Sequence, residues 1–410
     1  TMAKPKLALI PAAQGTKFYS VLPSDGSGDF TFNRGSVGTR INAQGLIENV
    51  ASGQSRLDYP LIDGVQKGCP HHILEPARTN LVTYSEDLSY FSKTNITEVN
   101  GNQVTPNGTI GSIKITPTSS SIAELQASSL TVGSSYSFSF FVKKAEASHL
   151  IINQAGSASQ KISYDIGNLS YIGISGVDAN IVSYGNEWVR VEYSVNSLTY
   201  NNIRIILSDG SNNYPYNPPI GDGLYLWGFQ LEQGSYPTSY IPTNGTSVTR
   251  SAETANGAGN STTFNDSEGV LMVEAAALSN DGTYRNISLS DGSTINRILI
   301  QYTPTANQIN IVIIYSGTQY SLNYTVSNAT EFNKFLIKYK TNDLALWVNG
   351  FELDTDTNAF LTSGLNTLSF DNTIGDVFYS KTKQLQYFDS ILADTQLEQL
   401  TSWQSFRDMA

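Results

Sequence analysis

The stretch that decides the fold class is Ser135-Tyr136-Ser137-Phe138-Ser139-Phe140-Phe141-Val142, where serine alternates with larger apolar side chains. A period of two is typical of a β-strand that buries one face, since successive side chains of a strand point to opposite sides. The segment Trp188-Val189-Arg190-Val191-Glu192-Tyr193 has the same character, as do residues 203–207, 309–315 and 335–339. The chain is therefore predicted to be rich in β-strands.

Turn residues separate these runs at short intervals. Asp-Gly and Asn-Gly steps supply the positive φ that tight hairpins need, and they stand at Asp25-Gly26, Asp209-Gly210, Asp281-Gly282, Asp291-Gly292 and Asn349-Gly350. Short strands with turns every roughly 8–12 residues indicate β-sandwiches rather than βαβ units. One helix is predicted near the end, with Asp394 as its cap and Leu397, Leu400 and Trp403 on one face.

These patterns predict an all-β chain of two tandem β-sandwich domains, preceded by an irregular β-rich N-terminal region and ending in a short helix. Composition suggests the boundaries: an N-terminal attachment or oligomerisation region at 1–78, a first sandwich at 79–250, a linker at 251–262 and a second sandwich at 263–410. The linker is inferred from the small residues that run from Ser251 to Asn260.

Charge and composition exclude several functions. The chain has 24 Lys and Arg against 35 Asp and Glu, a formal charge of 24 − 35 = −11, and no basic stripe that would bind nucleic acid. No apolar run approaches the roughly 18–20 residues of a membrane helix, so membrane insertion is not expected. With one cysteine, Cys69, the chain forms no internal disulfide. Charged residues are only 14% of the sequence, so neutral hydroxyls and amides must solvate the surface.

Three stretches carry a resemblance. They are 30–42 with 45–48 and 56–59; 74–87 with 226–243; and 339–350 with the terminal helix. They resemble bacteriophage tail-fibre and head-fibre-type virion adhesins, with a carbohydrate-binding-module-like sandwich and a C-terminal concanavalin-like, laminin-G-type jelly roll. The matching residues are framework residues, so the resemblance assigns no sugar site to particular positions.

The resemblance implies a protein on the virion surface, outside the cell. Its partners would be a host cell-surface polysaccharide, as the receptor, and other virion proteins. A homotrimer is implied by analogy with phage fibres, and oligomerisation would also cover exposed sheet edges. The region 30–42, with Arg34 and Arg40, is the candidate for attachment because its pattern is irregular.

Catalysis is not expected. Three histidines leave little room for a nucleophilic triad, and no Gly-x-Ser-x-Gly elbow is present. A glycosidase needs two carboxyl groups that face each other across the sugar, which one sequence does not reveal. Candidate carboxylates for such a pair are Glu187, Glu192, Asp209, Asp222 and Glu232.

Glycan binding needs exposed aromatic rings together with amides or carboxylates. The loop 211–219 offers both, and its candidate contacts are Tyr214, Tyr216, Asn213 and Asn217, stiffened by neighbouring prolines. A packed loop or a subunit interface is the alternative interpretation of this segment. Trp188, Trp227 and Trp347 lie in strand patterns, and a role in the core is expected of them.

No cofactor is predicted apart from a structural Ca²⁺. Its candidate ligands are Asp354 and Asp356, which alternate along 354–358 but lack the glycine and the final glutamate of an EF-hand loop. The cluster Cys69-Pro70-His71-His72 has metal-ligand residue types without a second pair at zinc-site spacing. A loop thiol beside two structural imidazoles is the alternative interpretation.

The sequence thus favours a non-catalytic virion fibre or adhesin that binds host glycan. A purely structural virion protein, such as a head fibre or capsid decoration, is the second hypothesis. A polysaccharide-degrading enzyme with binding modules is the third. Tyrosines exposed on one concave face would favour the adhesin. Tyrosines buried at subunit contacts would favour the structural protein, and a cleft with paired carboxylates would favour the enzyme.

Overall fold

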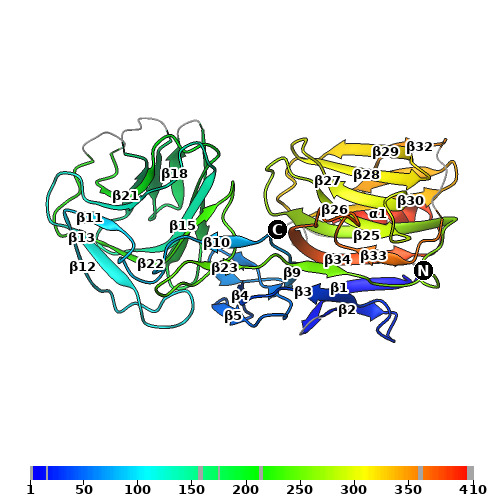
Figure 1. Cartoon of the computed structure of the whole chain (residues 1–410), viewed down its shortest axis with the longest axis horizontal. Coiled ribbons are helices and arrows are strands. Elements are labelled where there is room, and N and C mark those ends of the chain that lie inside the picture. The colour runs from blue at the N-terminus through cyan, green and yellow to red at the C-terminus, as the bar shows by residue number, and fades with distance from the viewer. Residues whose placement is uncertain are drawn as a thin grey trace.

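The computed structural model describes residues 3–14, 17–155, 160–173, 176–211, 216–358 and 363–403. Nearly all regular structure in these residues is β-strand, and α1 (Asp394–Thr401) is the one helix among them. Figure 1 shows two β-lobes side by side, joined by a layer of short strands. The predicted all-β class with a short C-terminal helix is confirmed.

The middle lobe is a sandwich of two antiparallel sheets. The first sheet contains, in spatial order, β11 (Ser92–Thr94), β14 (Glu124–Ser128), β21 (Asn202–Ser208), β16 (His149–Asn153), β17 (Ile162–Asp165) and β18 (Ser170–Gly173). The second contains β12 (Ile96–Asn100), β13 (Ile113–Pro117), β22 (Leu224–Gln233), β15 (Tyr136–Lys144), β20 (Trp188–Val195) and β19 (Val177–Ser183). Phe138 and Phe140 of β15 point into the core between the sheets, as the serine alternation predicts.

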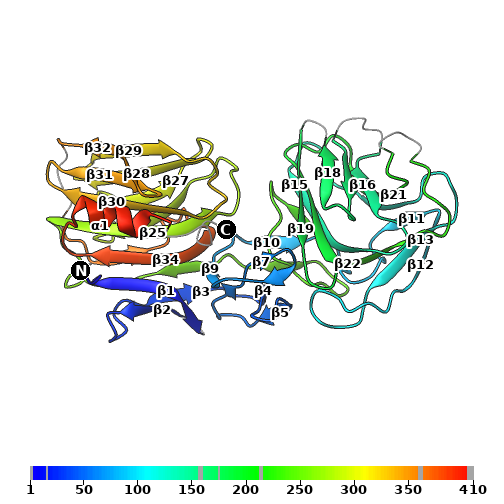
Figure 2. The ribbon, with the colours of Figure 1, turned by 180° about the vertical axis from the view of Figure 1, so that it is seen from behind.

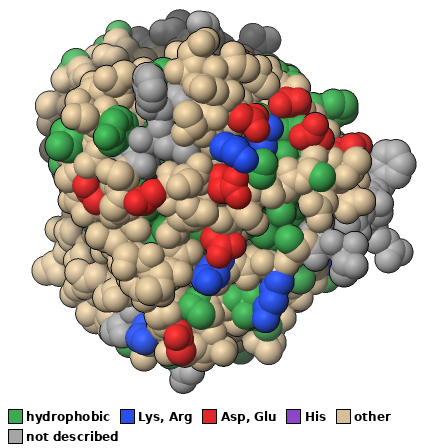
Figure 3. Space-filling view, turned by 90° about the vertical axis from the view of Figure 1, so that its right-hand side faces the viewer, with side chains coloured by type: hydrophobic (Ala, Val, Ile, Leu, Met, Phe, Trp, Pro, Cys, Tyr) green, Lys and Arg blue, Asp and Glu red, His purple; other side chains and the backbone are tan. Residues whose placement is uncertain are grey.

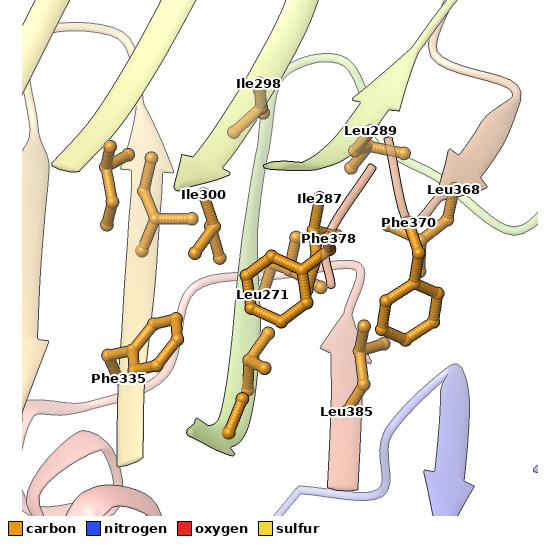
Figure 4. Packing of buried hydrophobic residues seen from close by; sticks show 14 of the residues in the cluster. Leu271, Ile287, Leu289, Ile298, Ile300, Phe335, Leu368, Phe370, Phe378 and Leu385 are labelled. Carbon is orange, nitrogen blue, oxygen red and sulfur yellow. The ribbon is translucent and has the colours of Figure 1, made fainter. Parts of the chain in front are cut away.

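The C-terminal lobe is a second sandwich. Its smaller sheet contains β29 (Thr318–Thr325), β28 (Gln308–Tyr315), β27 (Asn296–Tyr302), β26 (Arg285–Ser290) and β33 (Thr367–Ser369). Its larger sheet contains β24 (Thr254–Asn256), β3 (Phe30–Asn33), β2 (Lys17–Leu22), β1 (Leu7–Gln14), β34 (Ser380–Phe388), β25 (Glu268–Ala277), β30 (Asn333–Lys340), β31 (Leu344–Val348) and β32 (Phe351–Asp356). Figure 4 shows Leu271, Ile287, Ile300, Phe335 and Phe378 packed together between these sheets.

The N-terminal strands belong to the C-terminal lobe. β1 pairs with β34, with Leu7 opposite Tyr387, and Figure 1 shows the blue strands β1–β3 along the edge of that lobe. Phe18 and Phe30 are fully buried in its core. The strands pair locally, β1 with β2 and β2 with β3, but β1 and β3 also pair with β34 and β24, which lie more than 200 residues away and which the local pattern did not reveal.

The stretch 251–262, expected as a linker, is packed into the same lobe. It contains β24, which pairs with β3, with Ala255 opposite Phe32. Glu253, Ala255 and Ala258 are fully buried. Small side chains occur in exposed linkers and also where backbones pack closely, so composition did not distinguish the two.

A junction layer lies between the lobes, visible in Figures 1 and 2. It consists of β4 (Gly38–Ile41), β5 (Ile47–Val50), β6 (Leu57–Asp58), β7 (Leu61–Ile62), β8 (Val65–Gln66), β9 (His71–Ile73), β10 (Arg78–Asn80) and β23 (Val248–Arg250). β9 pairs with both β6 and β34, which fastens the layer to the C-terminal lobe. The hairpin β4–β5 covers the middle lobe, since Ile47 packs on Phe141, Trp188 and Trp227.

Helix α1 differs from the prediction in its start. Ala393 is the N-cap and Asp394 the first helical residue, so the predicted cap was one residue late. Leu397 and Leu400 pack on the outer face of the larger sheet, against Leu336 and Trp347. Figure 2 shows the helix across β30 and β25.

The surface is mainly neutral. In Figure 3, which looks at the end of the molecule formed by the C-terminal lobe, the Lys and Arg side chains lie among Asp and Glu, and most other atoms are neutral and polar. This agrees with the low charge content of the sequence. No helix among the described residues is long and apolar enough to cross a membrane.

Candidate functional site

The motif at 74–87 and 226–243 closes the middle lobe. The Asn80 amide donates to the carbonyl oxygens of Phe229 (3.0 Å) and Ile241 (2.8 Å). Its oxygen accepts the backbone N–H groups of Val82 and Leu231, each at 3.1 Å. All hydrogen-bonding groups of this buried side chain are thereby used, which marks it as framework.

A cleft of about 660 Å³ lies where the two lobes and the junction layer meet. We call it the junction cleft. The middle lobe contributes β19 and β20, and the junction layer contributes β4 and β6. The segment 235–240, which follows β22, also lines the cleft, and the C-terminal lobe contributes residues 277–280, Thr330 and Lys381. Segments that are far apart in the sequence therefore form one site.

The middle-lobe side of the cleft, which we call the polar wall, consists of Asp178, Asn180, Arg190, Glu192 and Ser194. In the antiparallel pairing of β19 and β20, Asp178 lies opposite Ser194 and Asn180 opposite Glu192. Residues two apart on a strand share a face, so these side chains point away from the sandwich core into the cleft. The Asn180 amide donates to Glu192 Oε2 at 3.2 Å.

Arg190 is a buried member of the polar wall. One terminal nitrogen donates to Ser139 Oγ (2.8 Å) and to the Thr238 carbonyl (2.7 Å), and the other lies 3.6 Å from Glu192 Oε1. Its Nε is buried without a hydrogen-bond partner in the described part of the chain. Burial acts to lower the pKa of Arg190, but Glu192, Tyr184, Glu232 and Glu75 together outweigh it and keep the pKa raised.

Tyr184 lies at the end of the polar wall, beside Arg190. Burial raises the pKa of its hydroxyl to about 12, so the group stays protonated and is a hydrogen-bond donor at neutral pH. Its ring meets Phe141 edge to face at 4.8 Å between centroids. Tyr184 thus places a fixed aromatic edge and a hydroxyl at the cleft.

The opposite side of the cleft carries Asp58 and Lys381. Asp58 Oδ1 accepts the backbone N–H of Ile41 at 2.7 Å, and Oδ2 lies 3.5 Å from His71 Nε2. Burial raises the pKa of Asp58, and the nearby charge of Lys381 works against that rise. Within the described residues, the ammonium of Lys381 has no hydrogen bond or ion pair of its own.

A buried charge network forms the floor behind the cleft. This junction cluster consists of Arg34, Arg56, Arg250, Glu75 and Glu253. Glu253 Oε1 accepts from Arg34 (2.7 Å) and from Arg56 (2.7 Å), while Glu75 accepts from Arg56 (2.8 Å) and lies 2.9 Å from Arg250. Burial acts to raise the pKa of Glu75, but Arg250 and Arg56 hold it well below its usual range.

The predicted core role of the tryptophans is confirmed. Trp188 and Trp227 are fully buried, and Trp347 is 6% exposed. Trp188 and Trp227 lie on the outer face of their sheet, under the β4–β5 hairpin, with Phe141 and Tyr240. Trp188 Nε1 donates to the Val104 carbonyl at 2.7 Å. These rings are packed and do not form an open stacking surface.

Of the loop proposed from sequence as a glycan contact, the described residues Tyr216 and Asn217 do not line the junction cleft. Asn213 and Tyr214 lie outside the described residues. Tyr216 is buried against Ile151 and Ile206, and Asn217 is exposed. The glycan contact of this loop stays a prediction.

The predicted calcium ligands bind backbone groups. Asp354 accepts the N–H groups of Asn323 and Thr355, each at 3.0 Å, and Asp356 accepts that of Asn358 at 2.7 Å. No group of three or more His, Cys, Asp or Glu side chains gathers within the described ranges.

The two histidines after Cys69 are buried, while Cys69 itself is exposed. The His72 ring stacks on Phe18, with centroids 3.9 Å apart. Burial lowers the pKa of His72 to about 3 and that of His71 well below its ordinary value. Both imidazoles are therefore neutral packing groups in the fold.

Of the carboxylates considered for a catalytic pair, Glu192 alone lies at the junction cleft. Glu232 is buried and accepts the N–H of Thr238 at 2.9 Å, and Glu187 is exposed beside Lys143. The alternation of 188–193 could have placed Arg190 and Glu192 on one face. Asp58 and Lys381 carried no sequence pattern that joined them to it.

No family model and no curated protein matches the chain. Among solved structures it is similar to the CBM40 of the Ruminococcus gnavus IT-sialidase, bound to α2,3-sialyllactose, with TM-score 0.31 and 16% identity over 36% of this chain and 94% of that chain. It is also similar to domains LG4-5 of the mouse laminin α1 chain, with TM-score 0.23 and 9% identity over 65% of this chain and 84% of that one.

A putative carbohydrate-binding protein from Bacteroides ovatus has TM-score 0.25 and 11% identity, over 78% of this chain and 84% of that chain. At these TM-scores and identities no site or property of the three proteins carries over to this chain. Its site is assigned from its own residues.

Proposed function

We propose that the chain binds a saccharide in the junction cleft without cleaving it. The observation that carries the proposal is the polar wall, where side chains at alternate positions of β19 and β20 present an amide, two carboxylates, a guanidinium and a hydroxyl to one cleft. Such groups can hydrogen-bond sugar hydroxyls, and Tyr184 adds an aromatic edge. A volume of about 660 Å³ lies within the range of ligand sites.

The engagement of the carboxylates supports binding without hydrolysis. A glycosidase needs one carboxyl group free to donate a proton and a second free to attack or to activate water. Three of the four carboxylates that line the described part of the cleft are engaged: Glu192 by Asn180, Glu75 by Arg56 and Asp58 by the Ile41 amide. The fourth, Asp178, is exposed. Asp58 and Glu192 nevertheless line the same cleft, so the enzyme hypothesis is tested directly below.

The setting we propose is a bacteriophage fibre or adhesin at the virion surface. It rests on the three stretches that resemble such proteins. Host cell-surface polysaccharide would be the ligand, and other virion proteins the attachment partners. A homotrimer would raise avidity by orders of magnitude, because each further contact becomes intramolecular.

A structural virion protein is the second candidate, and one observation favours it. Arg34 and Arg56 of the N-terminal region bind Glu253 inside the chain, which would stiffen the junction as a spacer requires. The buried Arg34 is also unavailable for the attachment contact that its motif suggested.

A glycan array with light scattering on the same sample tests these proposals. The array includes neutral and acidic polysaccharides and α2,3-sialyllactose, with and without EDTA. Binding by an oligomer, with no new reducing ends over time, supports the adhesin. Reducing ends that appear with time would revive the enzyme, and absence of binding by an assembled oligomer would favour the structural protein. Loss of binding in EDTA would indicate a metal ion such as the predicted Ca²⁺.

A further inference from the structure

We infer that the junction cleft selects an uncharged saccharide unit with neighbouring hydroxyls, held between the ion pair of Arg190 with Glu192 on one side and the charged groups of Lys381 and Asp58 on the other. This inference rests on the function proposed above and names its ligand class. The ion pair belongs to the middle lobe. Asp58 belongs to the junction layer and Lys381 to the C-terminal lobe, and both line the cleft.

Arg190 and Glu192 are near each other but do not form a direct hydrogen bond. The Arg190 terminal nitrogen and Glu192 Oε1 are 3.6 Å apart, beyond the usual length of an N–H···O hydrogen bond. The two hydrogen bonds to Ser139 and Thr238 come from the other terminal nitrogen of Arg190, so the nitrogen that faces Glu192 keeps N–H donors. A hydroxyl both donates and accepts, so one hydroxyl placed here would accept from Arg190 and donate to Glu192.

Lys381 and Asp58 both line the opposite side of the cleft and form no hydrogen bond or ion pair with each other. The Lys381 ammonium thus has unused donors, and Asp58 has an oxygen that lies 3.5 Å from His71 Nε2. A neighbouring hydroxyl of the same sugar would bridge this pair from the other side of the cleft.

The charges that line the cleft are balanced, which favours an uncharged ligand over an ionic one. Among the described lining residues there are three cationic side chains (Arg40, Arg190 and Lys381) and four anionic ones (Asp58, Glu75, Asp178 and Glu192). Arg56 and Arg250 pair with Glu75 from behind, and Glu48 pairs with Arg40. Neither sign is left in clear excess, so a charged sugar would lose hydration without a net counter-charge.

Matched pairs of methyl glycosides test the ligand class. Glucose, galactose and mannose are compared with their uronic acids, each pair differing only in CH₂OH against a carboxylate. Saturation-transfer NMR on the full chain measures binding up to about 50 mM ligand. We expect one neutral sugar to bind at least about tenfold tighter than its acid, with less than about a twofold change between low and high salt.

Two variants test whether the sugar binds at these charged groups. Glu192→Gln and Lys381→Met should each weaken the neutral ligand at least about fivefold, since each removes one charge-assisted bond. Lys383→Met is the matched control, because Lys383 lies on the same strand but approaches Glu274 and the Phe332 ring. Melting temperature confirms folding, and Lys381→Met, on a half-buried side chain, keeps the test open if Glu192→Gln does not fold.

The outcomes separate this inference from the proposed function. Preference for a uronic acid, with both variants weakened, overturns the neutral ligand class and leaves saccharide binding in the cleft intact. Neutral binding that neither variant weakens overturns the inference and moves the site away from the cleft. No binding by any glycoside overturns the inference, and no response on the glycan array overturns the proposed function as well.

Discussion

At the scale of single residues, Glu253 is the acceptor on which the junction cluster depends. It is fully buried and accepts bonds from Arg34, Arg56 and the Glu75 backbone N–H. The substitution Glu253→Gln keeps the shape of the side chain but leaves the arginines without their counter-charge. We expect it to lower the free energy of unfolding by about 3–5 kcal/mol, measured by urea denaturation.

The control for this change is Glu268→Gln. Glu268 pairs with Lys340 at 3.1 Å on the surface, where an ion pair contributes below about 1 kcal/mol. Equal effects of the two substitutions would show that the junction cluster does not stabilise the fold. The motif residues Arg34 and Arg56 were visible in the sequence. Their partner Glu253 was hidden in a stretch of small residues interpreted as a linker.

The buried histidines predict acid sensitivity. Burial lowers the pKa of His72 to about 3, whereas an unfolded histidine titrates near 6.5. Below pH of about 6.5 the unfolded chain therefore binds protons on this histidine that the folded chain does not bind. Stability is complete above pH of about 6.5 and falls below it, by up to about 1.4 kcal/mol per pH unit for each histidine.

Urea denaturation at pH of about 7.5, 6 and 5 measures this slope. His72→Phe should flatten it, because phenylalanine preserves the stacking on Phe18 and does not titrate. His149→Asn serves as the control, since His149 lies at the surface of the middle lobe beside Asp165. A slope that His72→Phe leaves unchanged would assign the acid sensitivity to other groups, such as His71.

At the scale of elements, the hairpin β7–β8 fixes one end of the cleft. Gly64 lies between these strands with φ +74°, and a Cβ there would stand 2.5 Å from the carbonyl oxygen of Tyr184. Gly64→Ala must push the hairpin from Tyr184, which lines the cleft. We expect a loss of about 1–3 kcal/mol in the free energy of unfolding and weaker saccharide binding.

Gly68→Ala separates the clash from backbone strain. Gly68 also has positive φ, +87°, but its nearest neighbour to a new Cβ is Pro60 at 3.8 Å. Both variants carry the strain of an alanine at positive φ, and the difference between their urea midpoints measures the contact with Tyr184. Identical midpoints and affinities would mean that the hairpin does not position this side of the cleft.

Strands with strong alternation were predictable, and strands without it were not. Residues 135–142 and 188–193 correspond to β15 and β20, because one face of each packs in the sandwich core. β1 could not be assigned to the C-terminal lobe, since its partner β34 lies more than 370 residues further along. Local patterns give strand character, whereas pairing over such distances depends on the completed core.

At the scale of the whole molecule, the candidate site exists only because the lobes meet. Arg190 belongs to the middle lobe, Asp58 to the junction layer and Lys381 to the C-terminal lobe. Tyr236 helps to hold this arrangement: its ring lies under Arg78 at 5.2 Å, and it interacts with Arg285 of the C-terminal lobe. The sequence could predict two sandwiches. It could not predict the cleft, which depends on how they are placed.

Saccharide binding in the junction cleft is tested most directly by filling the cleft. Asn180 is exposed on β19, and Asn180→Trp places an indole there at a strand position that accepts aromatic residues. Thr97→Trp is the control, on the exposed strand β12 at the opposite edge of the same sheet. Calorimetric titration with the strongest glycan of the array should show at least about a hundredfold loss for Asn180→Trp and none for Thr97→Trp. Equal affinity in the wild type and both variants would contradict a site in the cleft.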